Sequence, residues 1–236
     1  MLANVAAWSA QVLVLVVAVA LVLRAFKVTE PLVRLRAWHG VLLVSFLLPL
    51  LQPWHVSFTA PPDAIALVGA SNDLRQFDRE VTATVSWWSE ISWSRLALFV
   101  LIGGMGLRGA LLLLGAVRLR QLRRASLPWV PEPAWFGPAQ DTARAFASLR
   151  LSGDVESAVA FGWRRASIVT PVRLASASDA HQRAVIAHEL QHVARRDWLV
   201  VIAEECARAV AWFHPAVWFA LSEAQLAREE AVDRCV

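Results

Sequence analysis

The stretch AVIAHELQHVARRDW contains two histidines and a glutamate whose spacing, HELQH, suits metal chemistry. If the stretch is helical, His188 and His192 lie one turn apart on one face and can reach the same metal ion. Glu189 then lies beside the open coordination position, where its carboxylate can take a proton from water. The apolar neighbours predict a buried helix, in which imidazoles need polar partners. The alternative is a surface helix that carries the three residues by coincidence.

A catalytic zinc site needs a third protein ligand. One unbroken helix from His192 to His214 would carry the chain about 33 Å away, and a return helix to Glu229 would cover only about 21 Å. A helix break at 195–197, with Asp197 as the N-cap of a new helix, would shorten the outward path. The spacing therefore permits Glu229 without selecting it. The candidates downstream of His192 are Glu204, Glu205, His214, Glu223, Glu229, Glu230 and Asp233.

The composition is too apolar for an ordinary soluble domain. Hydrophobic residues make up 57% of the chain and charged residues only 18%, and the mean hydropathy is +0.48. These values indicate a membrane protein. Three segments of near-bilayer length account for them, at residues 5–23, 38–54 and 96–117, and tryptophans flank them as in interfacial belts. The middle segment has the shortest apolar centre, which a buried helix could also provide.

Basic residues predict how these segments are oriented. They cluster in the connection between the first two segments and again after the third segment, whereas the second connection is acidic. The positive-inside rule then places the first connection and everything after residue 118 in the cytoplasm, with the N-terminus outside. The first segment lacks a basic start and a small-residue cleavage site, so we expect a retained anchor in the inner membrane. The clustered residues are Arg24, Lys27, Arg34, Arg36, Arg118, Arg120, Arg123 and Arg124.

The isoelectric point near 10.3 could also indicate nucleic-acid binding. Because the arginines flank membrane segments, where they orient and anchor helices, we expect the bilayer as their partner and no direct contact with nucleic acid. Arg108 differs, since it lies inside the third segment, where a charge is costly. It either meets a partner, helped by the close packing that the neighbouring glycines allow, or its side chain snorkels to the interface. His39 and His55 flank the middle segment and are expected to be interfacial.

The region after the third segment predicts a small sheet. Residues 125–140 contain four prolines and are typical of an extended linker. A short helix is expected at Asp141–Leu149, and the alternating pattern of residues 149–169 predicts two or three short strands that end at Pro171. Ser178 or Asp179 is expected to cap the helix that carries His188. Beyond His192, two amphipathic helices broken at residues 214–215 are expected to lie against the bilayer surface or the membrane helices.

Three downstream motifs resemble those of a known family. HELQHVARRDWL, FHPAVWF and AREEAVD occur in this order, and they are similar to the HELxHxxRRDxL, FHPxVWW and REExxxD motifs of the BlaR/MecR-type membrane metallopeptidases. The upstream FGWRRASIVTP resembles the G-x-x-R-P-x-I-x-x-P strand of that family, with Ala166 where proline is frequent. The resemblance covers about residues 1–235, and its specific motifs lie between Gly162 and Asp233.

The resemblance implies a cytoplasmic, gluzincin-like zinc peptidase held by membrane helices, with one Zn²⁺ per chain. Glu229 would be the third zinc ligand beside His188 and His192, with Glu189 as general base. Asp233 would hold the far nitrogen of a ligand histidine, an arrangement common in zinc sites, and Asp197 would do the same or merely cap a helix.

The predicted fold class is mainly α with a small β-sheet. Residues 1–124 would form a multi-pass membrane domain, 125–140 the linker, and 141–236 an α+β peptidase domain. The family usually continues into a fourth transmembrane helix, so we expect the peptidase domain to be truncated at residue 236.

The predicted function is regulated proteolysis by a zinc endopeptidase, as in antibiotic-resistance sensors. The expected substrate is a cytoplasmic protein, such as a transcriptional repressor, or the peptidase itself, and a homodimer is compatible with the sequence. One alternative is a catalytically inactive membrane signalling scaffold. Another is a quality-control or prenyl-protein protease, which shares HExxH and a distant glutamate, although the RRD and FHPAVW motifs favour the first family.

Overall fold

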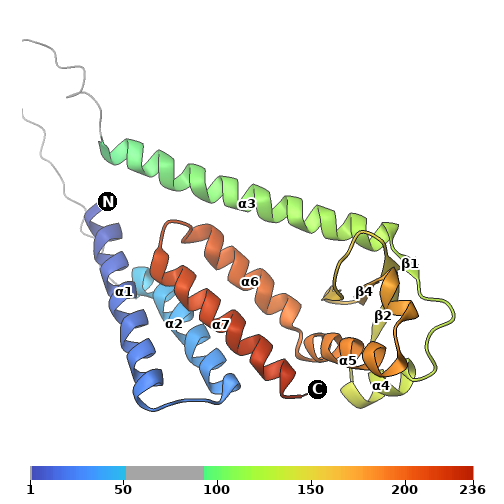
Figure 1. Ribbon diagram of the computed structural model, residues 1–236. Helices are drawn as coiled ribbons and strands as arrows, with labels where there is room; N and C mark the ends of the chain where they lie inside the picture. The colour runs from blue at the N-terminus through green and yellow to red at the C-terminus, as the bar shows by residue number, and fades with distance from the viewer. Residues whose placement is uncertain (1, 52–92, 236) are drawn as a thin grey trace, which may run out of the picture.

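The computed structural model describes residues 2–51 and 93–235, and three long helices dominate it (Figure 1). They are α1 (Leu2–Ala25), α2 (Pro31–Leu51) and α3 (Trp93–Ala125). All three are long and apolar enough to cross a membrane. The apolar runs of the sequence are thus continuous helices, as expected where every backbone polar group must be satisfied within its own segment.

The observed helices extend beyond the predicted segments. Helices α1 and α3 contain residues 5–23 and 96–117, and α2 begins at Pro31 rather than at residue 38. Proline is favoured in the first helical turn because its missing N–H would have no partner there. The early start brings Arg34 onto α2, which also carries His39. The end of the predicted middle segment, His55 and the acidic connection expected outside the membrane lie outside the described residues.

A four-stranded sheet follows α3, in the order β1-β2-β4-β3. The strands are β1 (Leu127–Pro128), β2 (Ala147–Ser152), β3 (Val159–Phe161) and β4 (Ala166–Pro171). Strand β4 runs parallel to β2 and antiparallel to β3, which forms one edge of the sheet. The predicted strands are therefore present, and the fold is mainly α with a small mixed sheet, as expected.

The helix expected at Asp141–Leu149 was placed wrongly. The structure has α4 at Phe136–Ala143, which begins inside the stretch interpreted as a linker and ends soon after the predicted start. Arg144 adopts a left-handed conformation with φ of 51°, which ends the helix. Strand β2 begins three residues later, at Ala147. Phe136 starts the helix because its ring is almost fully buried against the sheet core, a tertiary contact that the proline count does not reveal.

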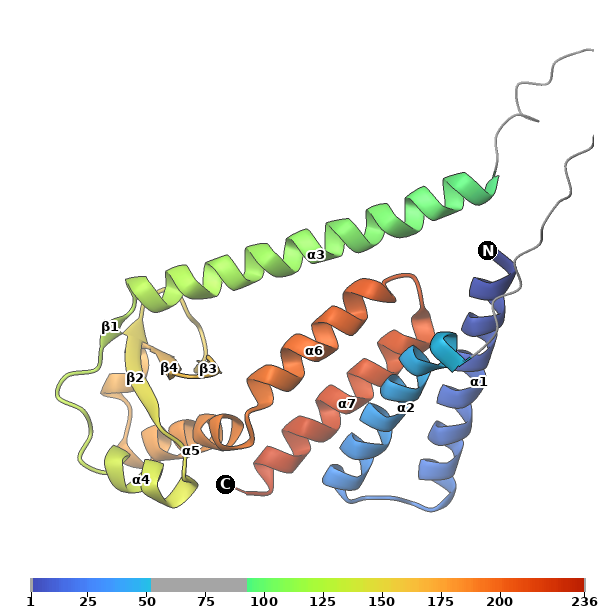
Figure 2. The same ribbon diagram turned by 180° about the vertical axis from the view of Figure 1, so that it is seen from behind.

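Three helices complete the chain after β4 and the 3₁₀ turn η4 (Val172–Ser176). Helix α5 (Asp179–Arg195) packs against the sheet and α4, and the expected Ser178 is its N-cap, accepting a hydrogen bond from the His181 amide. Helices α6 (Asp197–Val210) and α7 (Pro215–Asp233) follow, separated at residues 214–215 as predicted. Figure 2 shows α6 leading away from α5 and α7 returning beside α2.

Helix α7 packs against the membrane helices through a face of small residues. Its buried side chains join those of α1 and α2 in one hydrophobic cluster, and α2 is the main neighbour of α7. Small residues let two helix backbones approach closely. In a membrane this close van der Waals packing stabilises helix association, because lipid tails are as apolar as the side chains and the hydrophobic effect contributes little. The expectation that the last helices lie against the membrane helices is therefore met for α7. The buried residues of this face include Ala216, Ala220, Ala224 and Ala227.

Helix α3 lies close to α6 and to the residues that follow it. Gly104 lies against the Trp212 indole, and Trp212 donates a hydrogen bond of 3.1 Å from Nε1 to the Leu101 carbonyl. One turn further on, the Arg108 guanidinium lies 4.8 Å from the centre of the Trp218 ring. Of the two alternatives for Arg108, the structure thus favours contact with a partner, and the partner is in the same chain.

The close approach at Gly104 predicts a specific weakness. Gly104→Val should lower the thermal unfolding temperature of the purified protein in detergent, because a Cβ at this position would collide with the Trp212 ring, and overpacking typically costs about 1–3 kcal/mol. Gly106→Val is the matched control on the same helix, since nothing lies within 4 Å of a Cβ there. Equal unfolding temperatures for the two variants would contradict this account of α3 docking.

Candidate metal centre

Helix α5 presents the two histidines of HELQH on one face. Ile186 and Leu190 on the opposite side are almost fully buried against the sheet, which fixes the rotation of the helix. His188 and His192 then project together, and their Nε2 atoms lie 3.2 Å apart. The helical context expected from the sequence is therefore present.

A sharp break after α5 allows the chain to return to the histidines. Arg196 is left-handed with φ of 57°, so α5 ends at Arg195 and α6 starts in a new direction at Asp197. His214 caps α7 with its ring, accepting a hydrogen bond from the Val217 amide. Helix α7 then brings Glu229 back, with its Oε2 atom 3.5 Å from His192 Nε2 and 3.8 Å from His188 Nε2.

The three donor atoms fit a tetrahedral metal ion. Four ligands about 2.1 Å from a metal lie about 3.4 Å from one another. The separations of 3.2, 3.5 and 3.8 Å between His188, His192 and Glu229 are close to this edge length. In the described part of the chain, these residues form a group able to hold a metal ion, and a tetrahedron leaves the fourth position for water or substrate.

Two aspartates hold the far nitrogens of the histidines. His192 Nδ1 lies 2.8 Å from Asp197 Oδ2, and His188 Nδ1 lies 3.2 Å from Asp233 Oδ1. When each Nδ1–H donates to its carboxylate, both Nε2 lone pairs face the same point as the Glu229 oxygen. A cation held between the three atoms would stabilise such a convergence of electron pairs. In keeping with this, the hydrogen bond to Asp197 raises the pKa of His192 against the opposing effect of burial.

Asp197 serves His192 rather than the helix end. The residue at the N-cap position of α6 is Arg196, which makes no side-chain cap hydrogen bond, and Asp197 is the first helical residue. The Asp197 side chain is 8% exposed and also lies 3.5 Å from Arg195 Nε. Asp233, by contrast, is 69% exposed, so its hold on His188 is looser.

Glu189 is partly buried beside strand β3. Burial raises its pKa to about 7, although His192 and a hydrogen bond from the Ala160 backbone both lower it. The Ala160 amide belongs to the edge strand β3, so the sheet orients this carboxylate. A carboxyl group whose pKa lies near neutrality is suited to accept and return a proton at physiological pH.

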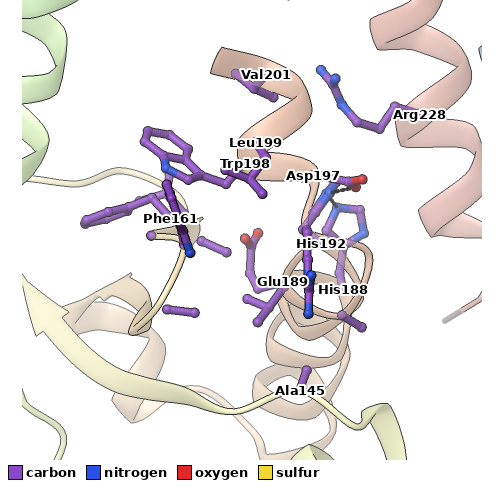
Figure 3. Close-up of a pocket in the computed structure, with 18 of the residues that line it drawn as sticks. Ala145, Phe161, His188, Glu189, His192, Asp197, Trp198, Leu199, Val201 and Arg228 are labelled. Carbon is purple, nitrogen blue, oxygen red and sulfur yellow. Dashed lines mark hydrogen bonds and ion pairs between the residues drawn. The ribbon is translucent and has the colours of Figure 1, made fainter. Parts of the chain in front are cut away.

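The site opens into a cavity of about 620 Å³ between β3, α5 and α6 (Figure 3). Glu189 projects into it beside the two histidines, and Phe161 and Trp198 form an aromatic wall with ring centres 6.1 Å apart. The cavity is large enough for several peptide side chains. It therefore joins the candidate metal centre to a space in which a polypeptide could lie.

The comparisons with known proteins agree with this geometry. The sequence model of the family described as BlaR1 peptidase M56 matches residues 3–236. The chain belongs to this family. It is also 32% identical over 82 residues to the regulatory protein BlaR1 of Bacillus licheniformis, a stretch that covers 35% of this chain and 14% of that relative. Together with the three apolar helices, family membership identifies a membrane protein of a peptidase family.

Four other ligand candidates of this M56 chain have partners away from the two histidines. Glu223 and Glu230 both pair with Arg34 of α2, at 3.4 and 2.7 Å. Glu205 pairs with Arg208 at 3.2 Å, and the second ring nitrogen of His214 lies 3.1 Å from the Ser9 carbonyl. Among the candidates that the sequence spacing left open, Glu229 has an oxygen that lies near both Nε2 atoms.

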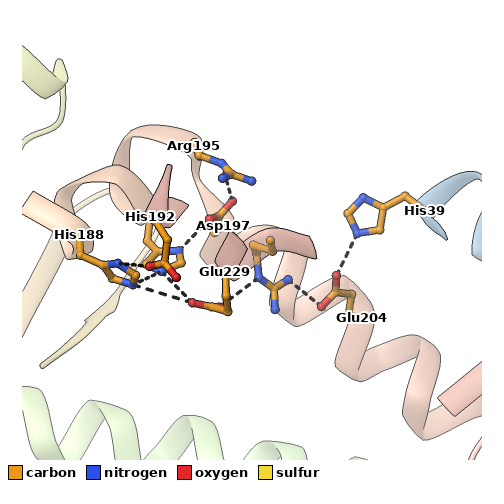
Figure 4. A network of polar contacts seen from close by, with 9 residues as sticks. His39, His188, His192, Arg195, Asp197, Glu204 and Glu229 are labelled. Atoms are coloured by element: carbon orange, nitrogen blue, oxygen red, sulfur yellow. Dashed lines mark hydrogen bonds and ion pairs between the residues drawn. The ribbon is translucent and has the colours of Figure 1, made fainter. Parts of the chain in front are cut away.

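Sequence reasoning missed a line of buried charges next to Glu229 (Figure 4). Arg228 Nη1 lies 2.8 Å from Glu204 Oε2, and Glu204 Oε1 lies 2.9 Å from Nε2 of His39 on α2. Burial alone would raise the pKa of Glu204, but the hydrogen bonds from His39 and Arg228 outweigh it and lower the pKa. His39, expected to be interfacial, has a defined partner in Glu204. The local sequence feature that could have indicated these contacts is Arg228, which directly precedes Glu229 in AREE.

Two neighbouring glutamates on α7 should respond differently to the same change. Glu229→Gln should weaken metal binding by more than the about 10- to 100-fold typical of losing a group that only orients a ligand, because an amide replaces a coordinating carboxylate. Glu230→Gln should leave the affinity unchanged, since Glu230 faces Arg34. Competition with a chromophoric chelator measures both affinities, and a larger loss at Glu230 would contradict the assignment.

Proposed function

We propose that this M56 chain is a zinc-dependent membrane endopeptidase. The observation that carries the proposal is the meeting of His188, His192 and Glu229 donor atoms at tetrahedral distances, with Glu189 beside them in a cavity. Two imidazoles and a carboxylate form a ligand set typical of catalytic zinc. Family membership supports peptide hydrolysis as the reaction.

In the proposed reaction each residue has a separate task. A zinc ion held by His188, His192 and Glu229 would act as a Lewis acid for the scissile carbonyl and lower the pKa of water toward ~7. Glu189 accepts the proton of the attacking water and passes it to the leaving amine. The hydrogen bond from the Ala160 backbone orients its carboxylate in the cavity.

The substrate class that fits the cavity is an extended segment of a protein. Strand β3 forms an edge of the sheet and borders the cavity, so a peptide could lie along it in the manner of an added strand. Side chains of such a peptide would meet the wall of Phe161 and Trp198. We propose a cytoplasmic regulatory protein, such as a transcriptional repressor, or another copy of this chain as the substrate. The name of the BlaR1 relative, a regulatory protein, supports a role in signalling.

We also propose that the site faces the cytoplasm from the inner membrane, with the N-terminus outside. The basic connection between α1 and α2 lies at the metal-site end of α7, since Arg34 pairs with Glu230 and Glu30 pairs with Arg234 at 3.0 Å. The basic C-terminal end of α3 leads directly into the sheet. The positive-inside rule assigns both basic ends to the cytoplasm.

The proposed catalytic role of Glu189 is tested with its isosteric amide. Glu189→Gln should abolish cleavage and leave the zinc content unchanged, because the amide cannot accept the proton and Glu189 is not a proposed ligand. The purified full-length chain in detergent, with zinc, is incubated with a mixed peptide library and with itself, and products are identified by mass spectrometry. Loss of zinc in Glu189→Gln would contradict the proposed role. Absence of cleavage by the unaltered protein would favour an inactive scaffold.

Cysteine labelling tests the proposed orientation. In a background of Cys206→Ser and Cys235→Ser, a cysteine at Ala66 should react with a membrane-impermeant maleimide on intact cells or spheroplasts. A cysteine at the exposed Ser157, beside β3, should react only after permeabilisation. The reverse pattern would overturn the orientation without affecting the metal-site proposal.

A further inference from the structure

The two oxygens of Glu229 have different surroundings. Its Oε2 atom faces the histidine nitrogens, whereas its Oε1 atom lies 3.9 Å from Nε of the preceding residue, Arg228. The Arg228 side chain is only 6% exposed, and Glu204, which binds its other end, is 8% exposed. The charge beside the third ligand is thus held inside the protein.

This charge is connected to a membrane helix. Glu204 bridges Arg228 of α7 and His39 of α2, with distances of 2.8 and 2.9 Å from its two oxygens. His192, by contrast, is held by Asp197, five residues further along the chain, with no membrane helix involved. Among the described residues, the contacts from Glu229 through Arg228 and Glu204 end at His39. His39 lies in helix α2, a candidate membrane span.

We propose that Arg228 is a positioning residue for Glu229, and that Glu204 and His39 make its position depend on how α2 lies against α6 and α7. The guanidinium attracts Oε1 and leaves Oε2 turned to the histidines, so Glu229 offers one oxygen to the metal. A displacement of α2 removes His39 from Glu204, loosens Arg228 and changes the affinity of the site. The membrane domain thereby regulates the metal centre through its third ligand.

The physical basis is the cost of separating buried charges. Once Arg228 and Glu204 are buried, each needs the other, because an uncompensated charge in the interior is strongly unfavourable. Arg228 therefore cannot swing away from Glu229 while Glu204 stays in place. Groups that orient a metal ligand in this way commonly change metal affinity by about 10- to 100-fold when they are removed.

A second contact between the same helices provides the control. Arg34 of α2 pairs with Glu230 of α7 at 2.7 Å, one residue from Glu229 but facing away from the histidines. Glu230→Gln removes this ion pair between α2 and α7 and leaves the small-residue packing, Arg228 and Glu204 in place. An effect on zinc that arises only from general docking would appear in this variant as well.

The test measures zinc affinity and the visible spectrum of the cobalt-substituted full-length protein, with thermal unfolding as a check on folding. Arg228→Met combined with Glu204→Leu removes the whole buried pair, a replacement that commonly preserves stability. This double variant should bind zinc about 10- to 100-fold more weakly and show an altered cobalt spectrum. His39→Leu should weaken zinc binding about threefold or more, and Glu230→Gln should behave like the unaltered protein.

The combined effect of the variants on zinc affinity shows whether His39 acts through Arg228 and Glu204 or only through helix packing. Added to the double variant, His39→Leu should have no further effect, because its link to Glu229 is already cut. The proposal is overturned if His39→Leu weakens binding equally in both backgrounds, or if the double variant matches the unaltered protein in affinity and spectrum. Since the proposal rests on the proposed metal site, His188→Ala is measured in parallel. If His188→Ala binds zinc as well as the unaltered protein, the proposed function fails, and this inference fails with it.

Discussion

The packing of α7 against α2 is the contact on which the site depends. Ala220, Ala224 and Ala227 are fully buried there, and their small side chains fix both the distance and the rotation of α7. The rotation decides which carboxylate meets which partner. Consecutive helical residues point about 100° apart, so Glu229 faces the histidines while Glu230 faces Arg34. If α7 were rotated by one residue, about 100°, Glu229 would no longer face the histidines.

This constraint joins the membrane helices to the chemistry. Two of the three candidate ligands lie on α5, which is fixed by the sheet core, and the third lies on α7, which is fixed by α1 and α2. The distances between the donor atoms therefore depend on two separate hydrophobic clusters. Packed cores switch between discrete arrangements rather than deform continuously. A small repacking of the membrane helices would therefore shift α7 as a rigid element and move Glu229 relative to the histidines of α5.

Local signals in the sequence predicted the features that form within one helix or at its ends. The HELQH spacing, the Ser178 cap and the break before Pro215 are short-range features, and the structure has all of them. The helix α4 was misplaced because the burial of Phe136 is a tertiary contact. Glu229 could be singled out only by family resemblance, since spacing left other acidic residues open. The pairing of His39 with Glu204, 165 residues apart, leaves no trace in the periodicity of either helix.

Glu189 and Glu229 illustrate how surroundings divide the work between identical side chains. Glu189 is largely withdrawn from water beside β3, so the desolvation of its charged form is the main effect on its pKa, which rises to about 7. The side chain of Glu229 is 45% exposed and lies between two imidazoles and a guanidinium. The first environment suits a group that exchanges a proton, and the second, with one oxygen turned to both histidines, suits a group that binds a cation. Exchanging the two roles would require moving α5 away from the sheet and α7 away from Arg228, which the two hydrophobic clusters prevent.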